Sequence, residues 1–244
     1  HLCLKGFHCH IGSQIFEKLS FSVATEKMLN FAAALRSSLN FTTEVLNMGG
    51  GFGVWYTEED AKNTPAEHKA YLQAIIQTVK TKCAEHKMPL PKLYIEPGRS
   101  IVGEAGITLY TAGNIKEIPA VRKYVAIDGG MFENPRHALY GSKYTVILAN
   151  RANNMPCERV SLAGKCCESG DLIAKDVNLP VVKEGDLIAV FTTGAYHYSM
   201  ASNYNRNLIP PAVLVKDGKA EYIVKPQSYA DLVRNDALPD YLNK

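Results

Sequence analysis

Over its first hundred residues the chain alternates short apolar runs with longer segments of helical periodicity. The apolar runs at residues 4–11, 43–48 and 92–96 are typical of buried strands. Residues 22–38 and 64–86 lie between them and have apolar positions at helical spacing. This order of strand, helix, strand, helix and strand predicts an α/β arrangement with a parallel sheet.

The two predicted helices have definable faces and one has a clear start. Thr64-Pro65-Ala66-Glu67 combines a capping-box pattern with proline at the first helical position. The apolar face expected for the first helix consists of Val23, Leu29, Phe31, Ala34 and Leu35. The face expected for the second consists of Tyr71, Leu72, Ile75, Ile76 and Val79.

After residue 104 the pattern changes to short β-branched and aromatic runs separated by Gly, Asp, Asn and Pro. Such runs predict an antiparallel β domain, either a sandwich or a barrel, with a terminal helix at 229–236. We therefore expect two domains, at residues 1–104 and 105–244. Three strand–helix units are too few to close an eight-stranded barrel, which takes about 250 residues. The first domain is then either a small open sheet or part of a larger barrel.

Composition removes several classes of function. The 244 residues are 46% hydrophobic and 21% charged, which is ordinary for a globular protein with a full core. The net charge is only +3 and no run of Lys and Arg stands out, so binding to nucleic acid or to a membrane surface has no electrostatic support. No apolar stretch reaches the roughly 18 residues of a membrane span.

Six cysteines are spaced irregularly, as expected of a reduced, cytosolic protein rather than one with a disulfide framework. Neither His8-Cys9-His10 nor Cys166-Cys167 has the spacing that places two ligands on one zinc ion. We therefore expect no metal site.

Three groups of polar or glycine residues lie at the carboxyl ends of the three predicted strands. They are His10-Ile11-Gly12-Ser13-Gln14 at the first, Gly49-Gly50-Gly51 at the second, and Glu96-Pro97-Gly98-Arg99 at the third. The carboxyl ends of barrel strands are where active sites lie, and glycines let backbone N–H groups approach an anion. Taken singly, each group also fits a structural histidine, a flexible loop, or a Pro-Gly turn beside a surface ion pair.

The second domain adds two stretches that hydrophobic patterning does not require. Cys167-Glu168-Ser169-Gly170-Asp171 places a thiol beside a carboxylate in a turn, although a cysteine is more often inert packing. Gly194-Ala195-Tyr196 and residues 199–205 are small, polar and aromatic.

Together and in this order, HIGSQ, GGGFG, EPGRS, CESGD and GAY with SxYN resemble the fold-type III decarboxylases that depend on pyridoxal phosphate (PLP). The resemblance is greatest to the diaminopimelate decarboxylases, because Glu168 stands where the ornithine and arginine branch usually has Asp. Arg136-x-x-x-Tyr140 agrees, since a guanidinium binds a distal carboxylate bidentately. The implied fold is the C-terminal part of a PLP-binding (β/α)8 TIM-like barrel, followed by an antiparallel β-sandwich or β-barrel domain.

The resemblance also implies which residues bind PLP. His10 would stack on the pyridine ring, the three glycines and Tyr196 would bind the phosphate, and Glu96 would pair with the ring nitrogen. A carboxylate there favours the protonated ring, which is the electron sink of the reaction. The full set of expected cofactor-binding residues is His10, Ser13, Gly49, Gly50, Gly51, Glu96, Gly98, Arg99 and Tyr196.

The same resemblance implies a substrate, a reaction and a partner. meso-Diaminopimelate would be decarboxylated to L-lysine and carbon dioxide, with Cys167 delivering a proton to the α-carbon. Cys167 and Glu168 would reach the active site of the other subunit, so a homodimer is expected. The expected substrate-binding residues are Arg99, Arg136, Tyr140, Glu168 and Tyr196, and the expected catalytic residues are Cys167, Glu96 and His10.

The lysine that binds PLP covalently lies in the family on the first barrel strand, in a motif similar to Y-A-x-K-A-N, and no such motif occurs here. The chain also begins at His1. We therefore expect a C-terminal piece that needs a missing N-terminal segment and is, alone, inactive and poorly soluble. The alternatives are an ornithine- or arginine-type decarboxylase or a racemase of similar fold, and a non-catalytic homologue that acts as a binding protein.

Overall fold

The structure is a computed structural model that describes residues 2–63 and 68–242. The described residues form two compact units. The first comprises the residues up to Gly106 together with Thr192–Ala195, and the second comprises Ile107–Phe191 and the residues from Tyr196 onward. The capping-box pattern at 64–67 lies outside the described residues.

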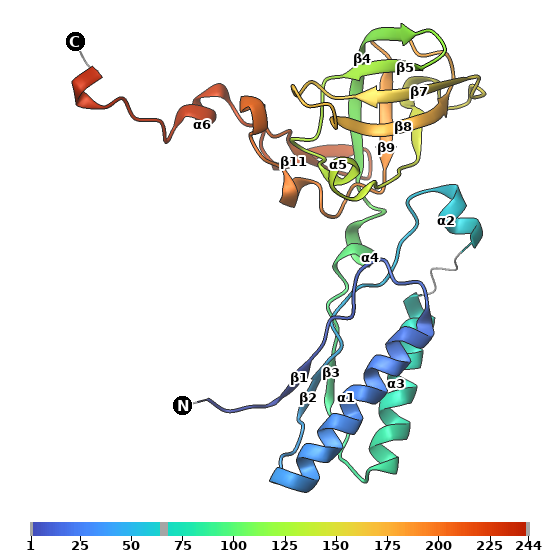
Figure 1. The fold of residues 1–244 in the computed structure, drawn as a ribbon, viewed down its shortest axis with the longest axis vertical. Coiled ribbons are helices and arrows are strands. Elements are labelled where there is room, and N and C mark those ends of the chain that lie inside the picture. Colours follow the sequence, from blue (N-terminus) through green and yellow to red (C-terminus); the bar gives the residue numbers. More distant parts are fainter. Residues whose placement is uncertain (1, 64–67, 243–244) are drawn as a thin grey trace. The chain divides into compact units, whose positions relative to one another are not determined.

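The first unit is built on a three-stranded parallel sheet (Figure 1). Its strands β1 (Gly6–His8), β2 (Val45–Asn47) and β3 (Lys92–Tyr94) pair in chain order. The connections contain α1 (Lys18–Leu39) and α3 (His68–Glu85), which pack against each other. Parallel neighbours require such crossover connections, and this order confirms the α/β prediction. Two shorter helices, α2 (Glu58–Asn63) and α4 (Gly98–Val102), follow β2 and β3.

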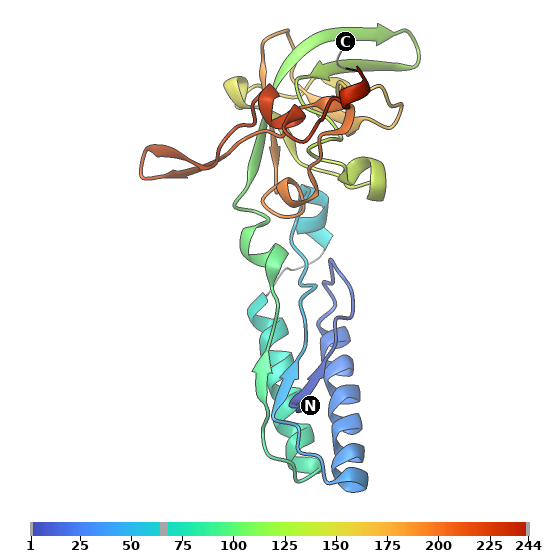
Figure 2. The same cartoon turned by 90° about the vertical axis from the view of Figure 1, so that its left-hand side faces the viewer.

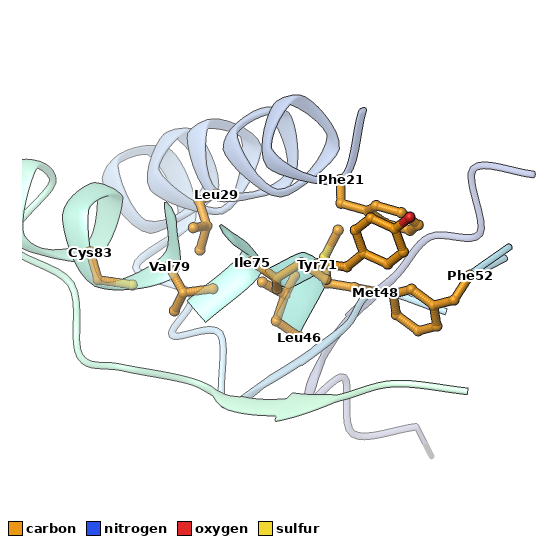
Figure 3. Packing of buried hydrophobic residues seen from close by; sticks show 9 residues of the cluster. All are labelled: Phe21, Leu29, Leu46, Met48, Phe52, Tyr71, Ile75, Val79 and Cys83. Atoms are coloured by element: carbon orange, nitrogen blue, oxygen red, sulfur yellow. The ribbon is translucent and has the colours of Figure 1, made fainter. Parts of the chain in front are cut away.

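The core of the first unit lies between the two long helices and one face of the sheet (Figure 3). Its buried members are Phe21, Leu29, Leu46, Met48, Phe52, Tyr71, Ile75, Val79 and Cys83. The predicted face of α3 is largely present, but Ile76 is 43% exposed.

The predicted face of α1 is wrong in part. Its buried residues are Phe21, Thr25, Leu29 and Ala32, whereas Val23 and Phe31 are 41% and 51% exposed. Thr25 is buried because its hydroxyl donates to the Phe21 carbonyl at 2.7 Å. A threonine whose hydroxyl is hydrogen-bonded within its own helix can be buried, and a prediction that ranks positions by apolarity does not identify it.

The second unit is dominated by a six-stranded sheet in the order β6-β9-β4-β5-β7-β8. The two outer strands, β6 and β8, are in contact, so the sheet is nearly closed (Figure 1). The strands are β4 (Ile107–Ile118), β5 (Arg122–Ile127), β6 (Val146–Leu148), β7 (Glu158–Ala163), β8 (Leu172–Leu179) and β9 (Leu187–Phe191).

The prediction of an antiparallel β domain is confirmed only in part, because β5 and β7 pair in parallel and the sheet is mixed. The connection between them contains α5 (Arg136–Tyr140) and β6, which makes it long enough for the crossover that parallel strands need. The remaining pairs of this sheet are antiparallel.

The end of the second unit is a separate antiparallel hairpin of β10 (Ala212–Lys216) and β11 (Lys219–Val224), which extends away from the six-stranded sheet (Figure 2). The predicted terminal helix is present as α6 (Tyr229–Val233), shorter than expected, with a capping box from Ser228. Short 3-10 helices lie at Ala149–Arg151, Tyr198–Met200, Tyr204–Arg206 and Asp240–Leu242. Within the described ranges, no helix has the length and apolarity to cross a bilayer.

Candidate functional site

The sheet of the first unit places polar side chains together on the face that the helices leave uncovered. Successive residues of a strand point to opposite faces, and Leu46, Met48 and Leu93 contact the core. His8 and Asn47 lie opposite each other in register at the carboxyl ends of β1 and β2, on the other face. Glu96 follows β3, and its carboxylate contacts the Asn47 side chain on that face.

These three side chains form one hydrogen-bonded group. The Asn47 amide nitrogen Nδ2 donates to Glu96 Oε1 at 2.7 Å, and His8 Nε2 lies 3.4 Å from the same oxygen. Glu96 Oε2 has no hydrogen-bond partner among the described residues. The carboxylate is therefore held through Oε1, which leaves Oε2 available to accept a hydrogen bond from a ligand. Neither His8 nor Asn47 was among the predicted site residues.

The triple glycine lets three backbone segments converge beside this group. A Cβ on Gly50 would lie 2.2 Å from the Glu96 carbonyl oxygen, and one on Gly51 would lie 2.2 Å from that of Gly12. Gly49 and Gly51 also have φ values of 66° and 94°, which side chains disfavour. Glycine is thus required here by close packing of the chain itself.

Two of the three glycine N–H groups donate to neighbouring side chains. Gly49 donates to Asn47 Oδ1 at 2.9 Å, and Gly50 donates to His10 Nδ1 at 3.2 Å. Because Nδ1 of His10 accepts this bond, the neutral imidazole carries its proton on Nε2. In the described structure the Gly51 N–H has no acceptor, which leaves it as the available anion donor of the three.

Arg99 is a buried cation at the start of α4. One guanidinium nitrogen donates to Ser13 Oγ at 2.9 Å and another donates to the Tyr56 hydroxyl, whose ring lies 5.6 Å from the guanidinium carbon. Tyr56 is buried and was not predicted. The neighbouring Gly98 donates its N–H to the Glu96 carbonyl at 3.0 Å and would accept a Cβ without contact.

In the second unit, Arg136 lies between two of the predicted tyrosines. Its guanidinium carbon is 5.3 Å from the Tyr140 ring and 5.5 Å from the Tyr196 ring, which are cation–π distances. The side chain is only 8% exposed, and its Nε has no hydrogen-bond partner. No carboxylate of the described residues forms an ion pair with it. Such a buried cation is suited to an incoming anion.

Cys167 and Glu168 lie exposed on a turn that Asp171 organises. The buried Asp171 carboxylate accepts the backbone N–H of Met131 at 2.6 Å and that of Cys166 at 2.7 Å. The N–H of Cys167 donates to the Asn205 side chain at 3.3 Å, which connects the CESGD and SxYN motifs.

The adjacent cysteines differ in environment. Cys166 is buried, and burial followed by the nearby Asp171 raises the pKa of its thiol. Cys167 is exposed, so it is the thiol that a substrate can reach. All six cysteines lie in the described part of the chain and are free thiols.

The second unit also buries a carboxyl group that sequence reasoning missed. Glu133 is 4% exposed and accepts the Tyr110 hydroxyl at 2.5 Å. Burial is the main cause that raises its pKa to about 7. Apolar surroundings penalise the charged form, so this carboxyl changes protonation near neutral pH.

The predicted residues thus fall into two sets. The first unit brings together His10, Ser13, Gly49, Gly50, Gly51, Glu96, Gly98 and Arg99, and the second unit brings together Arg136, Tyr140 and Tyr196 and carries Cys167 and Glu168 on a separate turn. Their roles stay predictions. In the described ranges, no three His, Cys, Asp or Glu side chains are grouped as a metal site.

Comparison with known proteins identifies relatives of the whole chain. Residues 1–103 match the family described as pyridoxal-dependent decarboxylase, pyridoxal binding domain. The diaminopimelate decarboxylase of Bacillus subtilis is 51% identical over 236 residues, which is 97% of this chain and 53% of that protein. The enzyme of the same name from Halalkalibacterium halodurans is also 51% identical, over 96% of this chain and 52% of that protein.

A solved structure agrees with these relatives. The crystal structure of diaminopimelate decarboxylase from M. jannaschii in complex with L-lysine superposes with a TM-score of 0.87 at 38% identity. It covers 96% of this chain and 52% of that one. The chain therefore spans about half the length of the relatives it matches.

Proposed function

Because this chain belongs to the pyridoxal-dependent decarboxylases, we propose that the complete protein decarboxylates meso-diaminopimelate to L-lysine and carbon dioxide. The observation that carries the proposal is the Glu96 carboxylate, held through Oε1 beside the glycine loop with Oε2 presented. A carboxylate placed in this way suits the nitrogen of a pyridine ring. The likeness to diaminopimelate decarboxylases over nearly the whole chain supports the choice of substrate.

The residues of the first unit fit PLP chemically. The Gly51 N–H supplies an anion donor, the exposed His10 imidazole supplies a flat ring for stacking, and Glu96 Oε2 supplies an acceptor for a ring N–H. Arg99 and Ser13 add a cation and a hydroxyl close by. When bound, PLP supplies the electron sink that stabilises the carbanion left by carbon dioxide.

The chain's own residues then have separate tasks in this proposal. Glu96 holds a proton on the ring nitrogen by keeping a negative charge beside it. Arg136, buried between Tyr140 and Tyr196, binds the distal carboxylate of the substrate, and Glu168 binds the distal ammonium. The exposed Cys167 thiol delivers the proton to the α-carbon.

We also propose the finer fold and the assembly. The sheet β1–β3 with α1 and α3 is part of a (β/α)8 barrel, at residues 1–104, and residues 105–244 form the β domain, of sandwich or barrel type. The complete protein contributes the PLP lysine and acts as a cytosolic homodimer in which Cys167 and Glu168 serve the other subunit's site. The six free cysteines agree with that compartment.

The buried Arg136 favours this proposal over an ornithine-type decarboxylase. A substrate with only a distal amine offers no anion to the Arg136 guanidinium, so the cation–π contacts with Tyr140 and Tyr196 would offset the free-energy cost of burying that charge less completely. A distal carboxylate neutralises it through charge-assisted hydrogen bonds.

The test uses the complete protein with PLP and compares carbon dioxide release from meso-diaminopimelate and from ornithine. We expect release from meso-diaminopimelate only, and a loss of kcat/KM of roughly 100-fold in Arg136→Leu. Arg159→Leu, whose side chain is 70% exposed, is the matched control and should act as the unchanged protein. Faster turnover of ornithine, or full activity in Arg136→Leu, refutes the proposed substrate.

A further inference from the structure

We propose that Asn47 is a positioning residue that fixes the Glu96 carboxylate and the glycine loop to each other, so that Oε2 is the oxygen available to the cofactor. This inference rests on the proposed function and concerns the same site. It follows from contacts of the chain itself, on the uncovered face of the β1–β3 sheet.

Both the nitrogen and the oxygen of the Asn47 side-chain amide form hydrogen bonds. Its nitrogen donates to Glu96 Oε1 at 2.7 Å, and its oxygen accepts the Gly49 N–H at 2.9 Å. Asn47 belongs to β2, which is the central strand of the sheet, so its backbone is held by strand pairing on both sides. A rigid strand therefore sets the position of a carboxylate that follows the end of β3.

A second contact limits the rotation of the carboxylate. His8, on β1, places Nε2 at 3.4 Å from the same Oε1. His8 and Glu96 side chains are 51% and 52% exposed, so an ion pair between them alone would hold the carboxylate weakly. The shorter amide bond from Asn47 is the stronger restraint, and His8 adds to it.

The consequence is an assignment of the two carboxylate oxygens. Oε1 is occupied by Asn47 and His8, whereas Oε2 has no partner within the described part of the chain. A ring N–H would therefore meet Oε2. Because the same amide accepts the Gly49 N–H, loss of Asn47 disturbs the carboxylate and the first glycine together.

The second unit contains a natural control. Asn150 bridges in the same way, donating to Asp186 Oδ1 at 3.0 Å and accepting the Leu187 N–H at 3.1 Å. Asn150 is not among the proposed site residues, so Asn150→Ala measures how much stability is lost when a bridging amide outside the site is removed. Asn47→Ser keeps a side-chain oxygen that can accept the Gly49 N–H, but it has no amide N–H to donate to Glu96. This variant therefore tests the positioning of the carboxylate separately from the support of the glycine loop.

The experiment compares Asn47→Ala, Asn47→Ser and Asn150→Ala in the complete protein loaded with PLP that is labelled with 15N in its ring. We expect both Asn47 variants to lower kcat at least tenfold with KM nearly unchanged, and to move the ring 15N resonance toward the unprotonated position. Asn150→Ala should leave kcat and the resonance as in the unchanged protein, whatever it does to the melting temperature.

Three outcomes overturn the inference. A folded Asn47→Ser with unchanged kcat and unchanged resonance refutes the positioning role while the proposed function stands. An equal loss of kcat in Asn150→Ala shows a structural effect only. If the unchanged protein neither binds PLP nor decarboxylates meso-diaminopimelate, the proposed function fails, and the inference fails with it.

Discussion

At the scale of single residues, the surroundings of some ionisable side chains shift their pKa values. Glu133 illustrates this, because burial raises the pKa of its carboxyl from 4.5 to about 7 although Tyr110 and Gly130 donate hydrogen bonds to it. Burial thus outweighs two hydrogen bonds that favour the charged form. The adjacent Tyr110 responds in the same direction, since burial and the Glu133 charge raise the pKa of its hydroxyl.

This raised pKa makes stability depend on pH with a definite sign. Between pH 4.5 and about 7 the folded protein retains a proton on Glu133 that the unfolded chain releases, so the free energy of unfolding falls as pH rises through that window. The expected loss is about 3 kcal/mol. Glu133→Gln, which resembles the protonated group, should remove it. Urea unfolding at pH 5 and pH 8 measures the difference.

The matched control for Glu133 is Glu117→Gln, which changes an exposed glutamate of β4. It should keep the pH dependence of the unchanged protein. If Glu133→Gln loses as much stability between pH 5 and pH 8 as Glu117→Gln does, the carboxyl of Glu133 is not the source.

Tyr56 offers a second prediction at this scale, concerning substrate binding. Tyr56→Phe removes the hydroxyl that accepts a bond from Arg99, which leaves a buried guanidinium N–H less well satisfied. If Arg99 binds substrate, KM for meso-diaminopimelate should rise roughly tenfold with kcat nearly unchanged. Steady-state kinetics of the complete protein measure both constants.

Tyr124→Phe provides the comparison for Tyr56, because Tyr124 accepts a bond from Arg122 at 3.3 Å and lies 5.8 Å from its guanidinium. This arginine–tyrosine pair lies outside the proposed site, so KM should not change. Equal KM values for the two phenylalanine variants would contradict a role of Arg99 in binding substrate.

At the scale of elements, the sequence predicts the order of strands and helices well and their faces less well. Strands β1–β3 and helices α1 and α3 follow from apolar periodicity. The exposure of Val23 and Phe31 does not follow from this periodicity, because contacts with other elements of the fold determine which face of a helix is buried. The parallel pairing of β5 with β7 is also set by tertiary structure, since neither strand carries a local sign of its direction.

Some residues of the candidate site could be predicted from the sequence and others could not. Glu96, His10 and the glycines are recognisable from motifs beside strand ends. Asn47 and Tyr56 make their contacts with residues far along the chain, so no sequence motif marks them. Alternation along β2 was the available signal for Asn47, because Leu46 and Met48 face the core and the residue between them must face the other way.

The glycine loop gives a prediction at the scale of elements. Gly50→Ala places a Cβ 2.2 Å from the Glu96 carbonyl oxygen, so the β2 and β3 ends must separate. We expect a loss of about 1–3 kcal/mol in stability and weaker PLP binding, by thermal unfolding and by cofactor titration. Gly98→Ala meets nothing within 4 Å and should be neutral in stability. Equal melting temperatures for the two variants would contradict the packing account.

At the scale of the whole molecule, the chain consists of two units with separate cores and separate polar clusters. The α/β unit carries the residues suited to a pyridine ring and a phosphate, and the second unit carries a buried arginine and an exposed thiol. The likeness to diaminopimelate decarboxylases extends over nearly the whole chain, which spans about half the length of the relatives it matches.

The central claim is that the complete protein forms lysine through PLP held at Glu96. The most direct measurement is the rate of lysine formation from meso-diaminopimelate by the complete protein, stripped of PLP and then reloaded. We predict no activity when stripped, recovery on reloading, and a loss of roughly 100-fold in reloaded Glu96→Gln. Lysine formation without PLP, or an unchanged rate in Glu96→Gln, would contradict the account.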